Sequence, residues 1–300
     1  MLLESCAADL GLPTQYLREL AEQGNFLYKS FSIPKRNGGL RTIHHPTPEL
    51  KVIQRYVARH VDRTCPVHNA AYAYRAGRGI GDHARAHAGA QYMLRMDMED
   101  FFPSITMPDV IAVLEERADL DSADAEWAAL IACREHCLTI GAPSSPTLSN
   151  AVCFQMDESL DGEARRVGAR YTRYADDLYF STSSPRVLGR LERNAHIVIR
   201  SQRIPSHLRV NRKKTVHSST RGRMSVTGLI LTPSGSVSIG RGKKRIVRSK
   251  VHRLDSLSPE ARRRLSGYLA FVRDVEPQYI DRLYVSFGHG VMDRAMSGRD

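Results

Sequence analysis

The sequence predicts an α+β protein, with a mixed body of helices and strands over residues 1–237 and a basic helical region over residues 238–300. Two observations support this prediction. Apolar residues recur at three- and four-residue spacing in several segments, and short strand-like runs alternate with them. Near Ser238 the chain becomes strongly basic and helical, so we place a domain boundary at about residue 237.

Helices are expected where apolar residues fall on one face. In the mixed body they are predicted at residues 1–24, 50–61, 108–117, 122–137, from 149 onward and 187–200. In the basic region, a second helix is expected to begin at Ser258, which can cap it with Pro259 in the first turn. A third is expected after Pro277.

Strands are expected at residues 31–34, 40–44, 92–96, 169–174, 178–181, 208–210 and 226–231. The first two flank residues 35–39, which read Lys-Arg-Asn-Gly-Gly. Asn and Gly tolerate positive φ, so this segment predicts the turn of a β-hairpin.

The composition indicates a soluble chain with an anionic partner. Of 300 residues, 42% are hydrophobic and 25% charged, and the net charge is +12. Nucleic acid is the most common partner of such a basic chain, although a merely basic surface has the same composition. We find no membrane-spanning run, no secretory signal and no CxxC pair among five cysteines, so we expect a reduced, cytoplasmic protein without membrane association.

Two acidic clusters carry the candidate chemistry. Asp97 ends a predicted strand, and the pair Asp176 and Asp177 lies between two others. Adjacent side chains on a regular strand point to opposite faces, so the pair serves one site only if the backbone turns there. A tight hairpin at this point, with Asp97 beside it, would form a hard-oxygen site suited to two Mg²⁺ ions and phosphoryl transfer. The alternative is that the pair is only a polar turn.

Five motifs in the same order resemble the reverse transcriptase family, and specifically its bacterial retron branch. They are Tyr174-Ala-Asp-Asp177, residues 97–105 (DMEDFFPSI), residues 141–150 (GAPSSPTLSN), Lys213-Lys214-Thr215 and Val226-Thr227-Gly228. The resemblance implies a right-hand polymerase fold, in which fingers and an antiparallel palm sheet packed on helices occupy residues 1–237 and a small helical thumb occupies residues 238–300. It also implies an RNA-directed DNA polymerase that consumes deoxynucleoside triphosphates.

The resemblance assigns metal and nucleotide roles. Asp97 and Asp176 would hold two Mg²⁺ ions, for which Mn²⁺ can substitute, with Asp177 in support and the carbonyl of Met98 as a further ligand. Phe102 would stack under the incoming sugar and exclude a 2′-hydroxyl. The plainer interpretation of Phe101 and Phe102 is core packing, which we expect to hold for only one of them.

Further residues are expected around the nucleotide. Lys35 and Arg41, on facing arms of the predicted hairpin, would grasp the triphosphate, unless the hairpin is only a solvated basic ribbon. Ala142 belongs to the loop that faces the nucleotide in the family. Lys214 is the candidate proton donor to the leaving pyrophosphate, with Lys213 as the alternative.

Two positions depart from the family pattern. The family usually has a glutamine where this chain has Ile140, and retron enzymes usually have an asparagine where it has His83. The first departure removes a polar contact to the nucleotide, and the second weakens the assignment to the retron branch.

Basic residues outside the site are expected to bind nucleic acid. We expect template contacts in the loop around Arg75 and Arg78, and phosphate contacts along the basic helix, unless that helix is a solvated face. The candidates on the helix are Lys243, Lys244, Arg245, Arg248 and Lys250.

Membership of the retron branch implies particular partners. They are a structured noncoding RNA that serves as template and 2′-hydroxyl primer, a branched RNA–DNA product, and an associated effector protein in antiphage defence. The alternatives are a reverse transcriptase from another bacterial element or defence system, and a catalytically idle RNA-binding scaffold.

Overall fold

The computed structural model describes residues 1–35 and 38–298. Its contacts divide the chain into two compact units. Unit 1 comprises residues 1–76, 94–180 and 186–216, and unit 2 comprises residues 77–93, 181–185 and 217–300. These units follow internal contacts, so the functional division at residue 237 stays a prediction.

Unit 1 is a mixed body of helices and strands, as predicted. Its α-helices are α1 (Leu2–Leu10), α2 (Thr14–Glu22), α3 (Pro48–Thr64), α5 (Met107–Arg117), α6 (Ser122–Ala132), α7 (Ser145–Val152), α8 (Phe154–Arg165) and α9 (Leu188–Ser201). Short 3-10 turns lie at η1 (Gly24–Phe26) and η3 (Arg212–Lys214), and a third, η2 (Pro185–Val187), precedes α9.

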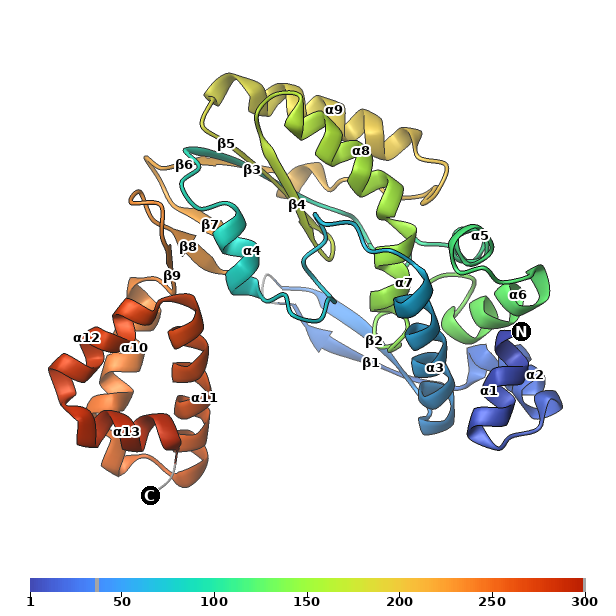
Figure 1. Ribbon diagram of the computed structural model, residues 1–300, viewed down its shortest axis with the longest axis horizontal. Helices are drawn as coiled ribbons and strands as arrows, with labels where there is room; N and C mark the ends of the chain where they lie inside the picture. Colours follow the sequence, from blue (N-terminus) through green and yellow to red (C-terminus); the bar gives the residue numbers. More distant parts are fainter. Residues whose placement is uncertain (36–37, 299–300) are drawn as a thin grey trace. The chain divides into compact units, whose positions relative to one another are not determined.

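A four-stranded sheet has the order β4-β5-β3-β6. The strands are β3 (Tyr92–Asp97), β4 (Arg170–Tyr174), β5 (Asp177–Thr182) and β6 (Val216–Ser219). In unit 1, α8 packs against β4 and α9 packs against α8 (Figure 1). The central strands are largely buried because helices cover them, and this holds the chain segments around Asp97 and Asp176 in fixed positions.

The predicted N-terminal hairpin is confirmed and is longer than expected. Strands β1 (Tyr28–Pro34) and β2 (Leu40–Pro46) pair antiparallel. Lys35 follows the last pair, and its backbone N–H donates to the carbonyl of Gly39 at 3.0 Å. Arg36 and Asn37 lie outside the described residues.

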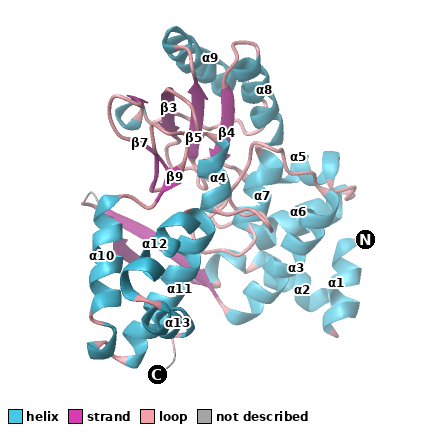
Figure 2. Ribbon diagram, turned by 60° about the vertical axis from the view of Figure 1, so that its left-hand side comes forward, coloured by secondary structure: helices cyan, strands magenta, loops and turns pink. Residues whose placement is uncertain are grey.

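The elements of unit 2 follow the prediction in outline. They are α4 (Ile80–Ala86), a small sheet of β7 (Met224–Val226), β8 (Leu229–Leu231) and β9 (Val237–Ser238), and the helices α10 (Arg241–His252), α11 (Pro259–Val275), α12 (Pro277–Phe287) and α13 (His289–Ser297), with the short turn η4 (Leu254–Ser256). Figure 2 shows the last four α-helices grouped together. As predicted, Ser258 caps α11, accepting from the N–H of Ala261 at 3.3 Å.

Several predicted boundaries are wrong. The helix expected at residues 122–137 ends at Ala132, because Arg134 and Cys137 exchange backbone hydrogen bonds in a tight turn. Residues 208–210 are not a strand; Val210 forms an isolated antiparallel bridge with Met98, the residue after β3. The strand expected at residues 226–231 is the hairpin β7–β8, which turns at Thr227 (φ 46°).

The core explains why the apolar spacing identified most of the helices. Leu17, Leu50, Ile53 and Val57 are fully or almost fully buried, and Val247 and Leu269 are buried in unit 2. No helix in the described part of the chain is both long enough and apolar enough to cross a bilayer.

Candidate active site

One cavity in unit 1 collects most of the predicted site residues. It has a volume of about 730 Å³. The predicted residues that line it are Lys35, Arg41, Asp97, Met98, Phe102, Asp176 and Lys214. They come from the β1–β2 hairpin, the end of β3, the turn between β4 and β5, and η3.

The paired aspartates lie on a tight hairpin, as the sequence required. β4 ends at Tyr174 and β5 begins at Asp177, so Ala175 and Asp176 form the turn. Ala175 has a φ of 56°, the left-handed conformation that reverses the chain. The N–H of Met98 donates to the carbonyl of Asp176 at 2.9 Å, which ties this turn to the end of β3.

The three aspartates have different partners. Asp97 and Asp176 both line the cavity, and the Nζ atom of Lys214 lies 2.7 Å from Oδ1 of Asp97. Asp177 is instead held by Arg95, whose Nε and Nη2 atoms donate to its Oδ1 at 3.0 and 2.9 Å. The sequence reasoning missed Arg95, although the two-residue period of a strand places it on the same face as Asp97.

The two hairpin carboxylates are difficult to ionise. Burial raises the pKa of Asp176, and the Asp97 carboxylate raises it further, while Lys214 and Arg41 oppose the rise. Burial also raises the pKa of Asp177 to about 6, against the opposing effect of Arg95. A cation between Asp97 and Asp176 would relieve this repulsion.

The donor set fits a hard cation only in part. In residues 1–35 and 38–298, no group of three Asp, Glu, His or Cys side chains is arranged to hold a metal ion. Asp177 is engaged by Arg95. Asp97, Asp176 and the adjacent carbonyl of Met98 remain, and these oxygens suit Mg²⁺, which uses few protein carboxylates and keeps several waters.

Phe101 and Phe102 differ in burial. Phe101 is 5% exposed and Phe102 is half-buried, and both line the cavity, so their separate roles stay a prediction. The ring centroid of Phe102 lies 6.3 Å from that of Tyr74, which also lines the cavity. Tyr74 has a φ of 61° and lies in an irregular loop, so no periodicity or motif pointed to it.

The β1–β2 hairpin brings its basic residues to the cavity, though not as a directly facing pair. Arg41 pairs with Ile33, and Lys35 lies just beyond the last pair of strand residues. Both nevertheless line the cavity that contains Asp97 and Asp176. The arrangement is consistent with cations placed to meet a bound triphosphate.

The loop at Gly141 docks closely on β2. The N–H of His44 donates to the carbonyl of Ile140 at 2.8 Å. Gly141 has a φ of +116°, and a Cβ there would lie 2.3 Å from the carbonyl oxygen of His44, so only glycine fits. Ile140 lines the cavity, whereas Ala142 is 4% exposed and is not one of the lining residues.

A buried ionic network contacts the turn between β4 and β5. Arg173 and Asp157 are fully buried, and the Nη2 atom of Arg173 lies 2.7 Å from Oδ2 of Asp157. Arg173 also donates to Oδ1 of Asn150 at 3.0 Å and to the carbonyl of Ala175 at 3.3 Å. The hydroxyl of Tyr171 donates to Asp157 at 2.8 Å. The network therefore joins α7, α8 and β4 to the catalytic turn.

The predicted nucleic-acid residues are not equivalent. The guanidinium of Arg75 donates to the carbonyls of His68 and Ala71 at 3.2 and 3.4 Å, and Arg78 is half-buried. On α10, the Nζ atom of Lys244 lies 2.5 Å from Glu276, which is 12% exposed, so this lysine is already paired. The exposed residues of the predicted set are Lys243, Arg245, Arg248 and Lys250.

His83, the second departure from the family pattern, is buried in unit 2. Its side chain is fully buried in α4, and burial lowers its pKa to about 3, so the imidazole is neutral. Nearby, Nδ1 of His87 lies 2.7 Å from Oγ of Ser181. The histidine at position 83 therefore fills a core position in this protein.

Comparison with known proteins agrees with this geometry. The model of the reverse transcriptase (RNA-dependent DNA polymerase) family matches residues 33–231. The chain is 34% identical over 283 residues to the Ec83 retron reverse transcriptase of Escherichia coli, covering 88% of both chains. It is 30% identical over 293 residues to the Ec86 retron reverse transcriptase of Escherichia coli, covering 95% of this chain and 90% of the relative.

Solved structures are similar in fold alone. Telomerase from Candida albicans, in complex with a fragment of telomeric RNA, has a TM-score of 0.51 at 13% identity, covering 95% of this chain and 60% of that chain. Apo telomerase from Candida tropicalis has a TM-score of 0.52 at 10% identity, covering 90% of this chain and 63% of that chain. The predicted right-hand polymerase fold is confirmed, and the chain belongs to the reverse transcriptase family, as a retron reverse transcriptase that polymerises DNA on an RNA template.

Proposed function

We propose that this enzyme copies a structured noncoding RNA into single-stranded DNA by two-metal nucleotidyl transfer. In the proposal, an RNA 2′-hydroxyl is the primer, so the product is a branched RNA–DNA. The observation that carries it is the shared cavity, in which two carboxylates, a neighbouring lysine and two hairpin cations meet.

The predicted residues that line the cavity have proposed parts in the reaction. Asp97, Asp176 and the carbonyl of Met98 would hold the metal ions, which activate the attacking hydroxyl and stabilise the leaving oxygen when bound. Lys35 and Arg41 orient the triphosphate. The ring of Phe102 lies under the sugar and leaves no room for a 2′-hydroxyl.

Lys214 is the proposed proton donor to the pyrophosphate. Its hydrogen bond to Asp97 raises its pKa, so the ammonium carries its proton at neutral pH. The ammonium keeps its proton in the resting site and transfers it when the leaving oxygen becomes basic.

The test is isolation of nucleic acid from cells that express the gene with its native flanking DNA. We expect a DNA joined to RNA through a 2′,5′ linkage, present with wild type and absent with Asp176→Asn. Unbranched cDNA in wild-type cells would contradict the proposed priming. We also propose that the enzyme acts in antiphage defence together with an effector protein. Phage should then plate less efficiently on wild-type cells than on cells with Asp176→Asn.

A further inference from the structure

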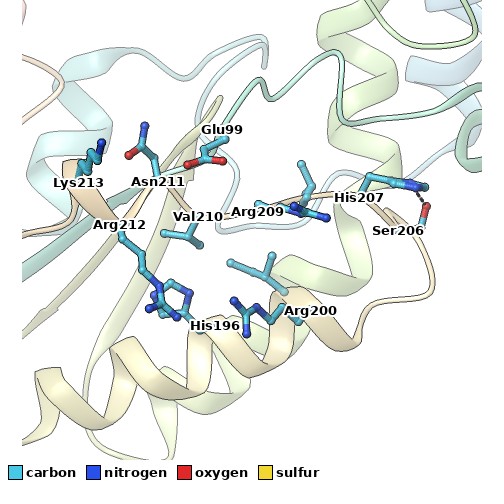
Figure 3. A pocket seen from close by; sticks show the side chains of 12 residues that line it. Glu99, His196, Arg200, Ser206, His207, Arg209, Val210, Asn211, Arg212 and Lys213 are labelled. Atoms are coloured by element: carbon cyan, nitrogen blue, oxygen red, sulfur yellow. Dashed lines mark hydrogen bonds between the residues drawn. The ribbon is translucent and has the colours of Figure 1, made fainter.

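A second cavity lies in unit 1 outside the residues assigned to catalysis. Its volume is about 780 Å³. One wall is the C-terminal half of α9, and the other is the segment at residues 206–213 that follows it (Figure 3). The residues that matter here are Arg200 on the helix, Arg209 and Arg212 on the segment, and His196 between them.

The arginines of this cavity are exposed and uncompensated. Arg200, Arg209 and Arg212 are all exposed, and no residue among 1–35 and 38–298 gives their side chains an ion pair or a hydrogen bond. Glu99 is the one carboxylate among the lining residues. Arg203, between Arg200 and Arg209 in the chain, pairs with Glu116, whereas these three arginines have no acidic partner in the described part of the chain, so the cluster keeps its positive charge.

The charges act on one another across the cavity. Figure 3 shows the side chain of Arg212 beside the ring of His196. Burial lowers the pKa of His196, and Arg212 and Arg200 lower it further, although Glu192 opposes them. The positive field of these two arginines opposes protonation of His196, and the same field favours a bound anion.

The second cavity adjoins the catalytic one. Glu99 and Asn211 line both cavities. The N–H of Glu99 donates to the carbonyl of Arg209 at 2.8 Å, and the N–H of Asn211 donates to the carbonyl of Asp97 at 2.7 Å. The basic segment is therefore attached to the strand that carries a catalytic aspartate.

The lining residues indicate which part of a ligand is recognised. They include two histidines, His196 and His207, but no Phe, Tyr or Trp on which a base could stack, and the apolar members are buried, among them Leu208. Three guanidinium groups instead offer paired donors that match phosphate oxygens. They lie on two chain segments, a spread that suits successive phosphates of a strand better than one compact ion.

We propose that Arg200, Arg209 and Arg212 form a binding site for the phosphodiester backbone of RNA beside the catalytic cavity. The site would hold a part of the RNA that is not being copied. This inference rests on the proposed function in that an RNA is the bound partner, and it adds a surface that neither the motifs nor the basic C-terminal helix includes.

The test uses the full-length protein and fluorescein-labelled poly(U) RNA, with binding followed by fluorescence anisotropy over a salt series. The variant Arg200→Ala/Arg209→Ala/Arg212→Ala should bind at least about tenfold more weakly. The slope of log K against log salt should become shallower by about 2, or about 0.7 for each of three lost phosphate contacts. The three Arg→Lys substitutions should restore most of the slope, because point charges remain.

A matched control removes the same charge elsewhere in unit 1. Arg165 at the end of α8, Arg166 just after it and Arg170 on β4 are exposed. Their replacement by alanine should leave the slope within about 0.5 of wild type. Equal losses in both triple variants would overturn the proposal, because net charge alone would explain them. Unchanged poly(U) binding, with weaker inhibition of DNA synthesis by pyrophosphate, would also overturn it and identify a site for free polyphosphate.

The same preparations separate this inference from the proposed function. Extension of oligo(dT) on poly(A) should continue in the arginine variant when the template and primer are saturating. If a variant binds poly(U) normally in vitro but the cells that express it lose the branched product, this result would count against the proposed priming alone. Loss of poly(U) affinity in a protein that still makes branched DNA at high RNA concentration supports the site.

Discussion

Removal of the carboxylate at Asp157 is expected to destabilise the enzyme strongly. Asp157 accepts from Nε of Arg173 at 2.9 and 3.1 Å and from its Nη2 at 2.7 Å, and neither side chain has any exposed surface. Burial alone would lower the pKa of Arg173, but the Asp157 carboxylate holds this pKa above its ordinary value. Asp157→Ala would therefore leave a buried guanidinium that remains charged.

The magnitude follows from the cost of an uncompensated charge. Breaking a buried ion pair by removing one partner costs about 3–5 kcal/mol. The hydroxyl of Tyr171 also loses its acceptor, but the two losses belong to one network and do not simply add. We expect the free energy of unfolding of Asp157→Ala to fall by about 3–5 kcal/mol, measured by urea denaturation at neutral pH.

Asp161→Ala is the matched control on the same helix. Its partner is Arg165, whose Nη2 atom lies 2.5 Å from Oδ2 of Asp161 and whose side chain is 74% exposed. Because solvent screens this pair, the free energy of unfolding should fall by less than about 1 kcal/mol. A loss in Asp157→Ala no larger than in Asp161→Ala would refute the reasoning. If Asp157→Ala does not fold, Asp157→Leu with Arg173→Met should recover much of the stability, because it removes both charges.

The paired substitution also separates stability from catalysis. Arg173 donates to the carbonyl of Ala175 in the catalytic turn, and methionine cannot. The paired variant should therefore fold yet have a lower kcat, with RNA binding unchanged. A wild-type kcat would show that the network contributes stability alone.

Three further predictions concern the cavity and the loop beside it. In the metal-free protein, the pKa of Asp177 is raised from 3.8 to about 6, so the stabilising effect of the protonated carboxyl is complete below pH 3.8 and is lost as pH rises through about 6. Asp177→Asn should therefore gain stability relative to wild type between about pH 4 and pH 7. A difference in urea melts that stays constant with pH would contradict this. Lys214→Ala should lower single-turnover nucleotide incorporation by about 10²–10⁴-fold, with partial recovery in Lys214→Arg, and a wild-type rate would remove its proposed role. Gly141→Ala should lower stability by about 1–3 kcal/mol, whereas Gly162→Ala, which meets no atom within 4 Å, should raise it slightly; similar thermal melts for both would argue against the close approach to β2.

The structural features of the site that the sequence predicted correctly are those encoded locally. Asp97 ends a strand and Asp176 occupies a tight turn, and both features follow from a few neighbouring residues. The hairpin that carries Lys35 and Arg41 was also readable, since turn residues and strand residues alternate there.

Partners far apart in the chain were not predictable in this way. Asp157 and Arg173 are separated by 16 positions on a helix and a strand, and nothing in either segment indicates the other. The basic cavity has the same origin, because Arg200 and Arg212 line one cavity only after the segment that follows α9 turns back alongside the helix. Arg95 had a readable position on β3, but its pairing with Asp177 depends on strand order.

The proposal that Asp97 and Asp176 hold the metal ions for DNA synthesis is tested most directly by a Mg²⁺ titration. The purified enzyme incorporates dTTP on poly(A) primed with oligo(dT), and the rate is measured at each Mg²⁺ concentration. Asp97, Asp176 and Asp100 all line the cavity, and Asp100 is a matched control because it has no assigned role. We expect Mg²⁺-dependent DNA synthesis by wild type and by Asp100→Asn. Asp97→Asn and Asp176→Asn should make no DNA, although both should bind poly(U) as wild type does. Synthesis at a wild-type rate by either of the last two variants would contradict the proposal.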